Sequence, residues 1–160
     1  MALNATDLAL FKAASNLGGA ISATELTSGL LGDVFDKFTG IETRDGITEY
    51  ACLYVKNKGA EPAENVTVHI DSETSHGSVN ATIGLGNSAV NGTETAIANK
   101  TTAPSSVTFV EATTEGAGLN IGTLAAGARK AIWIKLVVPA GTTAKNSYQF
   151  TPQINFDTGE

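Results

Sequence analysis

The sequence contains few of the residues from which catalytic and metal sites are usually built. Its 160 residues include one cysteine and two histidines, so neither an internal disulfide nor a four-ligand zinc site of cysteine and histidine is possible. His69 and His76 show no HExxH or HxH spacing, and we expect both on the wet surface. Cys52 lies in an apolar stretch and is expected to be a small buried residue with an unperturbed thiol. We therefore predict no enzyme, no catalytic residues, no metal ligands and no cofactor.

Charged and aromatic residues are also scarce, at 16% and 6% of the chain. An ordinary soluble domain has about 25% charged residues, so small polar and apolar side chains must form much of this surface. The net charge of −6 disfavours nucleic acid as a partner, because phosphate binding depends on clustered lysine and arginine. The few aromatic residues fall mostly at strand positions, which leaves no exposed stacking platform for sugars or bases.

Long apolar runs are missing as well, since no segment approaches the 18 or so residues of a membrane span. Residues 1–12 lack the basic start and the long apolar stretch of a secretory signal. We therefore expect synthesis in a cytoplasm and no membrane partner. The length predicts one domain, or one domain with an appendage.

Residues 1–45 differ from the rest of the chain and are expected to form an N-terminal arm with short helical turns. Asp7 can cap a first turn, and Ser22 with Glu25 has the spacing of a capping box. The apolar residues expected on the helical faces are Leu8, Leu10, Phe11, Leu30, Leu31, Val34, Phe35 and Phe38. Two interpretations stay open: the segment packs across its own domain, or it docks on a neighbouring subunit.

From residue 46 onward the apolar pattern changes to the period of two that is typical of strands. Strands are predicted, in chain order, over residues 47–56, 65–71, 78–85, 107–111, 119–124, 130–138 and 148–157. Pro152 suits an edge strand because proline has no N–H to donate. Residues 86–106 have no sustained period and predict a long surface loop of functional or mobile character. Residues 46–160 are therefore predicted to form an all-β domain, an antiparallel β-sandwich of immunoglobulin-like type.

Trp133 is the single tryptophan, and it shares a strand face with Lys135 instead of with Ile132 and Ile134. Two roles are open for it, because a large aromatic side chain can either fill the sandwich or anchor a subunit contact. Together with the eight apolar residues of the arm, Trp133 completes the set of candidate interface residues.

Three segments in the first third of the chain resemble the opening of small virion structural proteins of tailed bacteriophages. They are residues 15–21 (SNLGGAI), 29–35 (GLLGDVF) and 46–57 (GITEYACLYVKN). In that group a Gly-Gly segment leads to a short apolar stretch ending in Phe, and then to a strand similar to G-x-T-E-Y-R-C-x-Y-V-K-N. The chain departs from this pattern at Ala51, where a basic residue is common. A weaker similarity, at residues 57–59, 65–68 and 124–127, is to the strand-turn pattern of immunoglobulin-like modules in adhesins and phage proteins.

The phage resemblance implies a structural virion component, above all a capsid decoration or cement protein that binds and stabilises the lattice of the major capsid protein. Such proteins often form trimers over the local threefold axes of a capsid. The resemblance therefore also implies a homotrimer on the capsid surface of the virion, made in the cytoplasm of the bacterial host. The alternative is a tail-associated protein, or a receptor- or carbohydrate-binding module of immunoglobulin-like fold.

Overall fold

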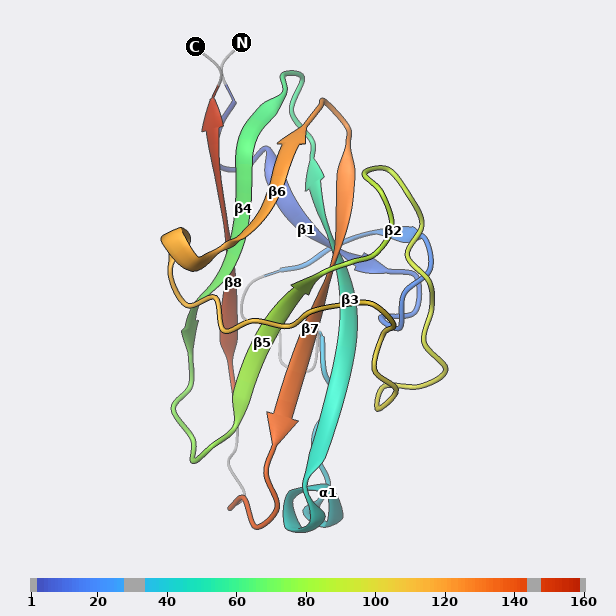
Figure 1. Ribbon diagram of the computed structural model, residues 1–160, viewed down its shortest axis with the longest axis vertical. Coiled ribbons are helices and arrows are strands. Elements are labelled where there is room, and N and C mark those ends of the chain that lie inside the picture. Colours follow the sequence, from blue (N-terminus) through green and yellow to red (C-terminus); the bar gives the residue numbers. More distant parts are fainter. Residues whose placement is uncertain (1–2, 28–33, 144–147, 159–160) are drawn as a thin grey trace.

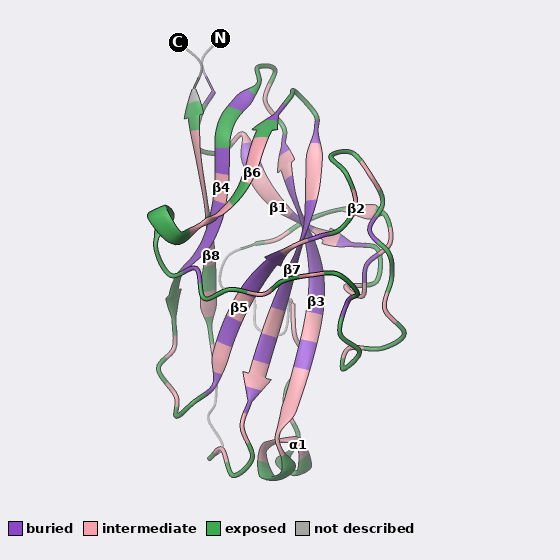
Figure 2. Cartoon of the chain, viewed as in Figure 1, coloured by how far each residue is buried: buried purple, intermediate pink, exposed green. Residues whose placement is uncertain are grey.

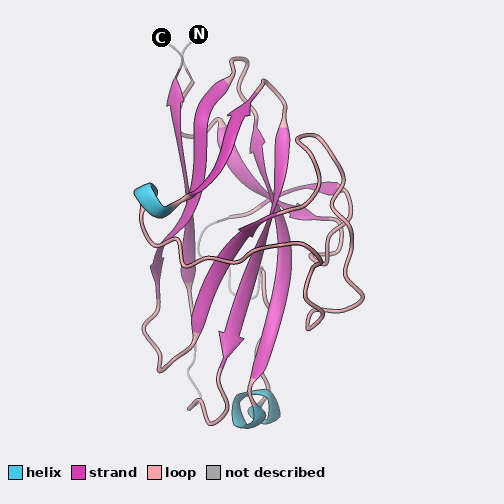
Figure 3. Ribbon diagram, viewed as in Figure 1, coloured by secondary structure: helices cyan, strands magenta, loops and turns pink. Residues whose placement is uncertain are grey.

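The computed structural model describes residues 3–27, 34–143 and 148–158, whose strands form two antiparallel sheets (Figure 1). The five-stranded sheet has the order β2 (Ile21–Glu25), β1 (Leu8–Ala13), β3 (Ile47–Asn57), β7 (Arg129–Val138) and β5 (Asn80–Leu85). The three-stranded sheet has the order β6 (Leu119–Leu124), β4 (Ala63–Glu73) and β8 (Phe150–Thr158). The chain also contains a short helix, α1 (Gly40–Asp45), and a 3-10 turn, η1 (Glu115–Ala117) (Figure 3). The expected all-β class is confirmed.

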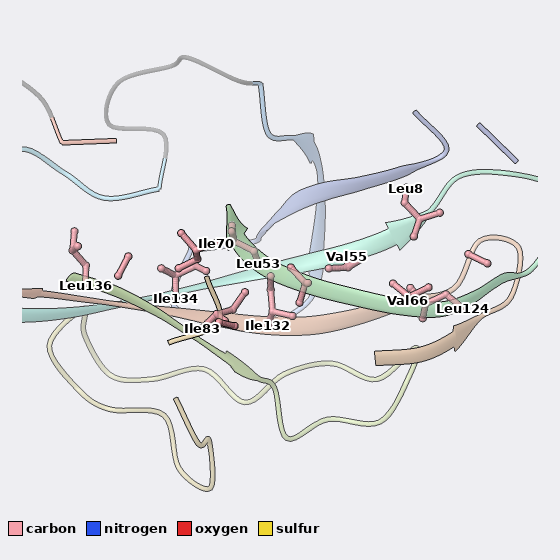
Figure 4. Close-up of a cluster of buried hydrophobic side chains, with 14 of the residues drawn as sticks. Leu8, Leu53, Val55, Val66, Ile70, Ile83, Leu124, Ile132, Ile134 and Leu136 are labelled. Carbon is pink, nitrogen blue, oxygen red and sulfur yellow. The ribbon is translucent and has the colours of Figure 1, made fainter. Parts of the chain in front are cut away.

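The main apolar core lies between the two sheets (Figure 4). Leu53 of β3 and Ile132 and Ile134 of β7 point into it from the five-stranded sheet. Val66 and Ile70 of β4 close it from the three-stranded sheet. Alternate residues of each strand thus remove apolar surface from water, which contributes about 25 cal/mol per Å² to stability.

The opposite face of the five-stranded sheet carries a second apolar cluster. Cys52, Tyr54 and Trp133 are fully buried in it. The cover comes from the segment between β5 and β6, which forms a long loop and then crosses in front of β3, β7 and β5 (Figure 1). In this segment the ring of Phe109 lies 5.6 Å from the ring of Tyr50. Both faces of β3 and β7 are therefore covered, which explains why their sequences are apolar on both faces.

Six of the seven predicted strands are present, as β3, β4, β5, β6, β7 and β8. The predicted strand over residues 107–111 is wrong. That segment makes one isolated bridge, between Val110 and Ile83, while Val107 and Phe109 pack on the second cluster. Apolar and polar residues alternate in this segment because one of its sides packs on an apolar surface. This alternation is also the pattern of a strand, which explains the prediction, but only one bridge forms.

The helical turn expected after Asp7 is also wrong, because the residues that follow form strand β1 and pair with β3. Leu8 packs in the main core and Phe11 in the second cluster. The apolar side chains of this short run therefore point to both faces of the sheet. Over so few residues, this pattern cannot be distinguished from one apolar face of a helix. Ser22 and Glu25, whose spacing suggests a capping box, lie in β2. The part of the chain assigned to an arm thus supplies two strands of the five-stranded sheet.

Residues 34–39, which we call the strap, lead from the arm region into α1 and adopt no helix. The helical face expected there is wrong for these residues, and Leu30 and Leu31 lie outside the described residues. The helix begins only after Thr39, whose hydroxyl accepts a hydrogen bond from the N–H of Glu42. The carboxylate of Glu42 accepts one from the N–H of Thr39, which completes a capping box at this point.

Candidate functional site

The strap and β8 each contribute half-buried apolar side chains that pack against the main core, and the two segments meet at Phe35 and Phe150. We call these residues the open-side band: Val34, Phe35, Phe38, Phe150, Ile154 and Phe156. All of them pack against the core and keep part of their surface exposed. The rings of Phe35 and Phe150 lie 6.0 Å apart between centroids and are tilted by 59°, an arrangement that aromatic pairs favour. The strap therefore covers β8 only in part.

The band keeps part of its surface exposed because, among the described strands, β8 lies at the edge of its sheet with β4 as its neighbour. No residue from 150 to 157 is buried, whereas most of β7 is (Figure 2). The predicted edge position of Pro152 is confirmed. An edge strand with half-covered apolar residues offers surface to another molecule.

α1 presents a further apolar side chain at the end of the molecule opposite the first and last described residues (Figure 1). Ile41 is 64% exposed, the largest value among the exposed large hydrophobic residues of the described chain. It follows Phe38 of the band by three positions. Ile41 is not among the predicted interface residues, because the helical turns are predicted earlier in the chain, although the spacing of Thr39 and Glu42 is itself a capping-box signal.

Three of the candidate interface residues are core residues instead. Trp133 is 0% exposed, Leu8 6% and Phe11 7%. Because a buried side chain offers no surface to a partner, the prediction of an interface through these three residues is wrong. Leu10 is partly buried and packs against the main core. The three candidates of the strap all lie in the open-side band.

The long loop, residues 86–106, is attached to the five-stranded sheet by a buried glutamate, Glu94. Its carboxylate accepts hydrogen bonds from the backbone N–H groups of Asn87 at 3.0 Å and Ser88 at 2.9 Å. The indole N–H of Trp133 donates a third at 3.1 Å. Burial by itself raises the pKa of this carboxyl, but the hydrogen bonds from Ser88, Trp133 and Asn87 outweigh it and leave the pKa below its usual value.

The same part of the long loop contacts the turn after β1. The N–H of Gly19 donates to the carbonyl of Glu94 at 2.9 Å, and the hydroxyl of Tyr54 donates to the carbonyl of Gly19 at 2.6 Å. Gly18 has a φ of +104°, and a Cβ at this position would lie 2.7 Å from the carbonyl oxygen of Thr95. Glycine is therefore required at Gly18 by both conformation and space. The Gly-Gly pair of the virion-protein resemblance lies at this contact.

Farther along the long loop, Lys100 forms a second attachment, to the first half of β3. Its carbonyl accepts a hydrogen bond from the N–H of Tyr50 at 2.8 Å. Its ammonium lies 2.6 Å from Oε1 of Glu49 and 3.6 Å from Oε1 of Glu42. Glu49 is fully buried, and burial raises its pKa even though the ammonium of Lys100 acts to lower it. The interaction with Glu49 in turn raises the pKa of Lys100.

The histidines and the cysteine only partly match the sequence analysis. His69 is 3% exposed, so its expected surface position is wrong, and its Nε2 lies 3.9 Å from Oδ1 of Asp71. His76 is partly exposed, with Nε2 at 2.7 Å from the carbonyl oxygen of Thr143. Cys52 is buried as predicted, but burial raises the pKa of its thiol, so the thiol is not unperturbed.

Within residues 3–27, 34–143 and 148–158, no three histidine, cysteine, aspartate or glutamate side chains gather in a way that could hold a metal ion. Among the helices of the described chain, none is both long and apolar enough to cross a membrane. Comparisons with protein-family models, curated proteins and solved structures found no match.

Proposed function

We propose that this protein is a structural virion component of a tailed bacteriophage, and that it acts as a capsid decoration protein. It binds the lattice of the major capsid protein on the capsid surface and stabilises it by contact. The observation that supports this most is the exposed apolar surface: the half-exposed side chains of the open-side band and, on α1, the exposed Ile41. The resemblance of residues 15–21 and 46–57 to virion proteins indicates the class of partner.

We also propose that the two sheets form an immunoglobulin-like sandwich. The order β1, β3, β7, β5 corresponds to the A-B-E-D sheet of a constant-type domain, and β4 beside β8 corresponds to strands C and F. In that topology strand G pairs with strand F, and within the described part of the chain no strand takes this position beside β8. In a constant-type domain strand G covers this edge. Here a partner's surface would meet the open-side band at the same edge.

A decoration protein needs contact area more than chemistry. A stable interface buries about 1,600 Å² in total, and the apolar part contributes about 25 cal/mol per Å². The open-side band and Ile41 suit the apolar centre of such a contact, with the polar residues of β8 at its rim. The net charge of −6 favours a partner face that carries lysine and arginine.

Heads of the encoding phage assembled without this protein provide the test. The purified wild-type chain should bind these heads, and electron microscopy should place it on the capsid surface. Ile41→Asp should weaken binding by about tenfold or more, because the contact would bury a charge. Val90→Asp is the matched control, since Val90 is 41% exposed but belongs to the long loop. It should bind as the wild type does.

The outcomes separate the proposal from its alternatives. Loss of head binding by Val90→Asp with unchanged binding by Ile41→Asp would place the capsid contact on the long loop and contradict the role of Ile41. Wild-type chain that binds glycans or host cells but not heads would favour a receptor- or carbohydrate-binding module. Wild-type chain found on tails and absent from heads would favour a tail-associated protein. The proposed homotrimer is tested separately by sedimentation equilibrium, in which a monomer at all concentrations would contradict it.

A further inference from the structure

A pocket of about 340 Å³ lies between the strap, the turn after β1 and the end of the long loop. Part of its wall is apolar, formed by Leu17 and Phe35 among others. The rest is charged, because Asp36, Glu49 and Lys100 also line it. An apolar wall beside a buried carboxylate is suited to a ligand with both an apolar and a cationic part.

The buried carboxylate in this pocket has too few hydrogen-bond donors. Glu49 is 0% exposed, and its Oε1 lies 2.6 Å from the ammonium of Lys100. Both carboxylate oxygens are buried and neither has a hydrogen-bond partner among the described residues, so the contact between Oε1 and Lys100 is an ion pair. Buried carboxylate oxygens are normally satisfied, so Oε2 retains the capacity to accept a hydrogen bond from a molecule that enters the pocket.

The charges around the pocket are unequal. Asp36 and Glu49 line it, and Glu42 lies 3.6 Å from the ammonium of Lys100, the positive charge of the described lining. The side chain of Lys100 is 39% exposed, whereas that of Glu49 is 1% exposed. Lys100 can therefore turn toward Glu42 and water when another cation arrives, but Glu49 cannot leave the pocket.

We propose that this pocket binds an alkylammonium or alkylguanidinium group, with the cationic head at Glu49 and the apolar stem along Phe35 and Leu17. A head with several N–H donors supplies the bond that Oε2 lacks and takes the place of Lys100 at Oε1. Such a group can come from a lysine or arginine side chain of a partner, or from a free polyamine. The inference rests on the pocket alone and holds whether or not the protein belongs to a virion.

Chemical rescue of Lys100→Ala is the central experiment. This variant leaves Glu49 buried without its cation, so its Tm should fall by about 5 °C or more. Added n-butylammonium or n-butylguanidinium should raise this Tm in a saturable way, by about 3 °C at ten times Kd. The wild type should bind the same probes about tenfold more weakly, because Lys100 competes for the carboxylate. Tetramethylammonium has the same charge but no N–H group and should not rescue.

Two matched variants test whether Glu49 is the residue that binds the cationic head. Glu49→Gln should abolish saturable probe binding, followed by NMR shifts of the strap and long-loop amides. Glu115→Gln removes the same charge from η1, outside the pocket, and should bind as the wild type does. Tighter binding of spermidine than of the butyl probes would identify a free polyamine as the source, and the reverse order a basic side chain.

The inference is wrong if neither the wild type nor Lys100→Ala shows saturable probe binding, or if Glu49→Gln binds as well as the wild type. Equal rescue by tetramethylammonium would also overturn it, since charge alone would then explain the effect. If Lys100→Ala does not fold, titrations of the wild type and Glu49→Gln decide the question by themselves.

Discussion

Two of the contacts that attach the long loop to the five-stranded sheet contain a buried glutamate, and the two glutamates lie in different environments. At Glu94 three N–H groups donate to the carboxylate, and its pKa is lowered. At Glu49 one ammonium faces the carboxylate, and its pKa is raised by burial. Two equally buried residues of one type thus shift in opposite directions, because the number of donors determines whether the charged form is stabilised. The Glu94 attachment is a closed structural anchor, and the Glu49 attachment retains an unused acceptor.

The largest effect is expected from breaking the Glu94 attachment at its aromatic donor. Trp133→Ala should lower the free energy of unfolding by about 3 to 5 kcal/mol, because it leaves a cavity and removes one of the donors to Glu94. Denaturant unfolding measures this change. Trp133→Phe keeps most of the packing and should lose clearly less; equal losses would mean that packing contributes little here.

Glu94→Gln tests the charge of the same attachment and should cost about 2 kcal/mol near neutral pH. The amide keeps the shape but not the charge that the three donors favour. Because the folded pKa of Glu94 lies below its usual value, the wild-type advantage exists above the unfolded pKa and disappears as the pH falls through the folded one. Unfolding curves of both proteins from about pH 7 to about pH 3 follow this loss. A constant difference over that range would contradict the charge-based account.

Glu49→Gln should change the free energy of unfolding in the opposite direction and by less: we expect a gain in stability of up to about 1 kcal/mol near neutral pH. The variant removes a buried charge, and the Lys100 that remains is 39% exposed and stays hydrated. The folded pKa of Glu49 is raised, so the charged form destabilises the wild type above that pKa and this penalty vanishes as the pH falls. The gap between variant and wild type should therefore close on acidification. A clear loss of stability at neutral pH would show that the ion pair is itself stabilising.

The smallest change in stability is expected at Ile41, which lies outside both glutamate attachments. Ile41→Asp changes a side chain that is 64% exposed, in the first turn of α1, where an acidic residue is favourable. Its free energy of unfolding should stay within about 0.5 kcal/mol of the wild type in the same denaturant titration. A larger loss would mean that Ile41 supports the fold, and reduced binding to heads could then not be assigned to the contact.

The strands from β3 onward could be predicted from the sequence because their alternation is long and turn residues separate them. The same reasoning failed for β1, where four apolar residues in sequence fit a helical face as well as two sheet faces. It failed again at residues 107–111, where alternation reflects packing on an apolar surface and only one bridge forms.

The two buried glutamates show why the site was harder to predict than the fold. Glu94 lies in a segment without periodicity, and its indole donor is 39 positions away at Trp133. Glu49 occupies an inward position of β3, but most of the other residues that line its pocket come from the turn after β1, the strap and the long loop. Local pattern carries no information about contacts of this range, which depend on the tertiary arrangement of loops.

Pro152 has a consequence for how the protein behaves at high concentration. Exposed edges of sheets pair with one another and seed aggregates, a hazard that grows with the number of copies a cell must make. Because proline has no N–H group, the edge of β8 has one hydrogen-bond donor fewer at Pro152, while the apolar side chains near it remain available for contact. The strand can thus adhere through side chains and is hindered from recruiting further strands into a fibre.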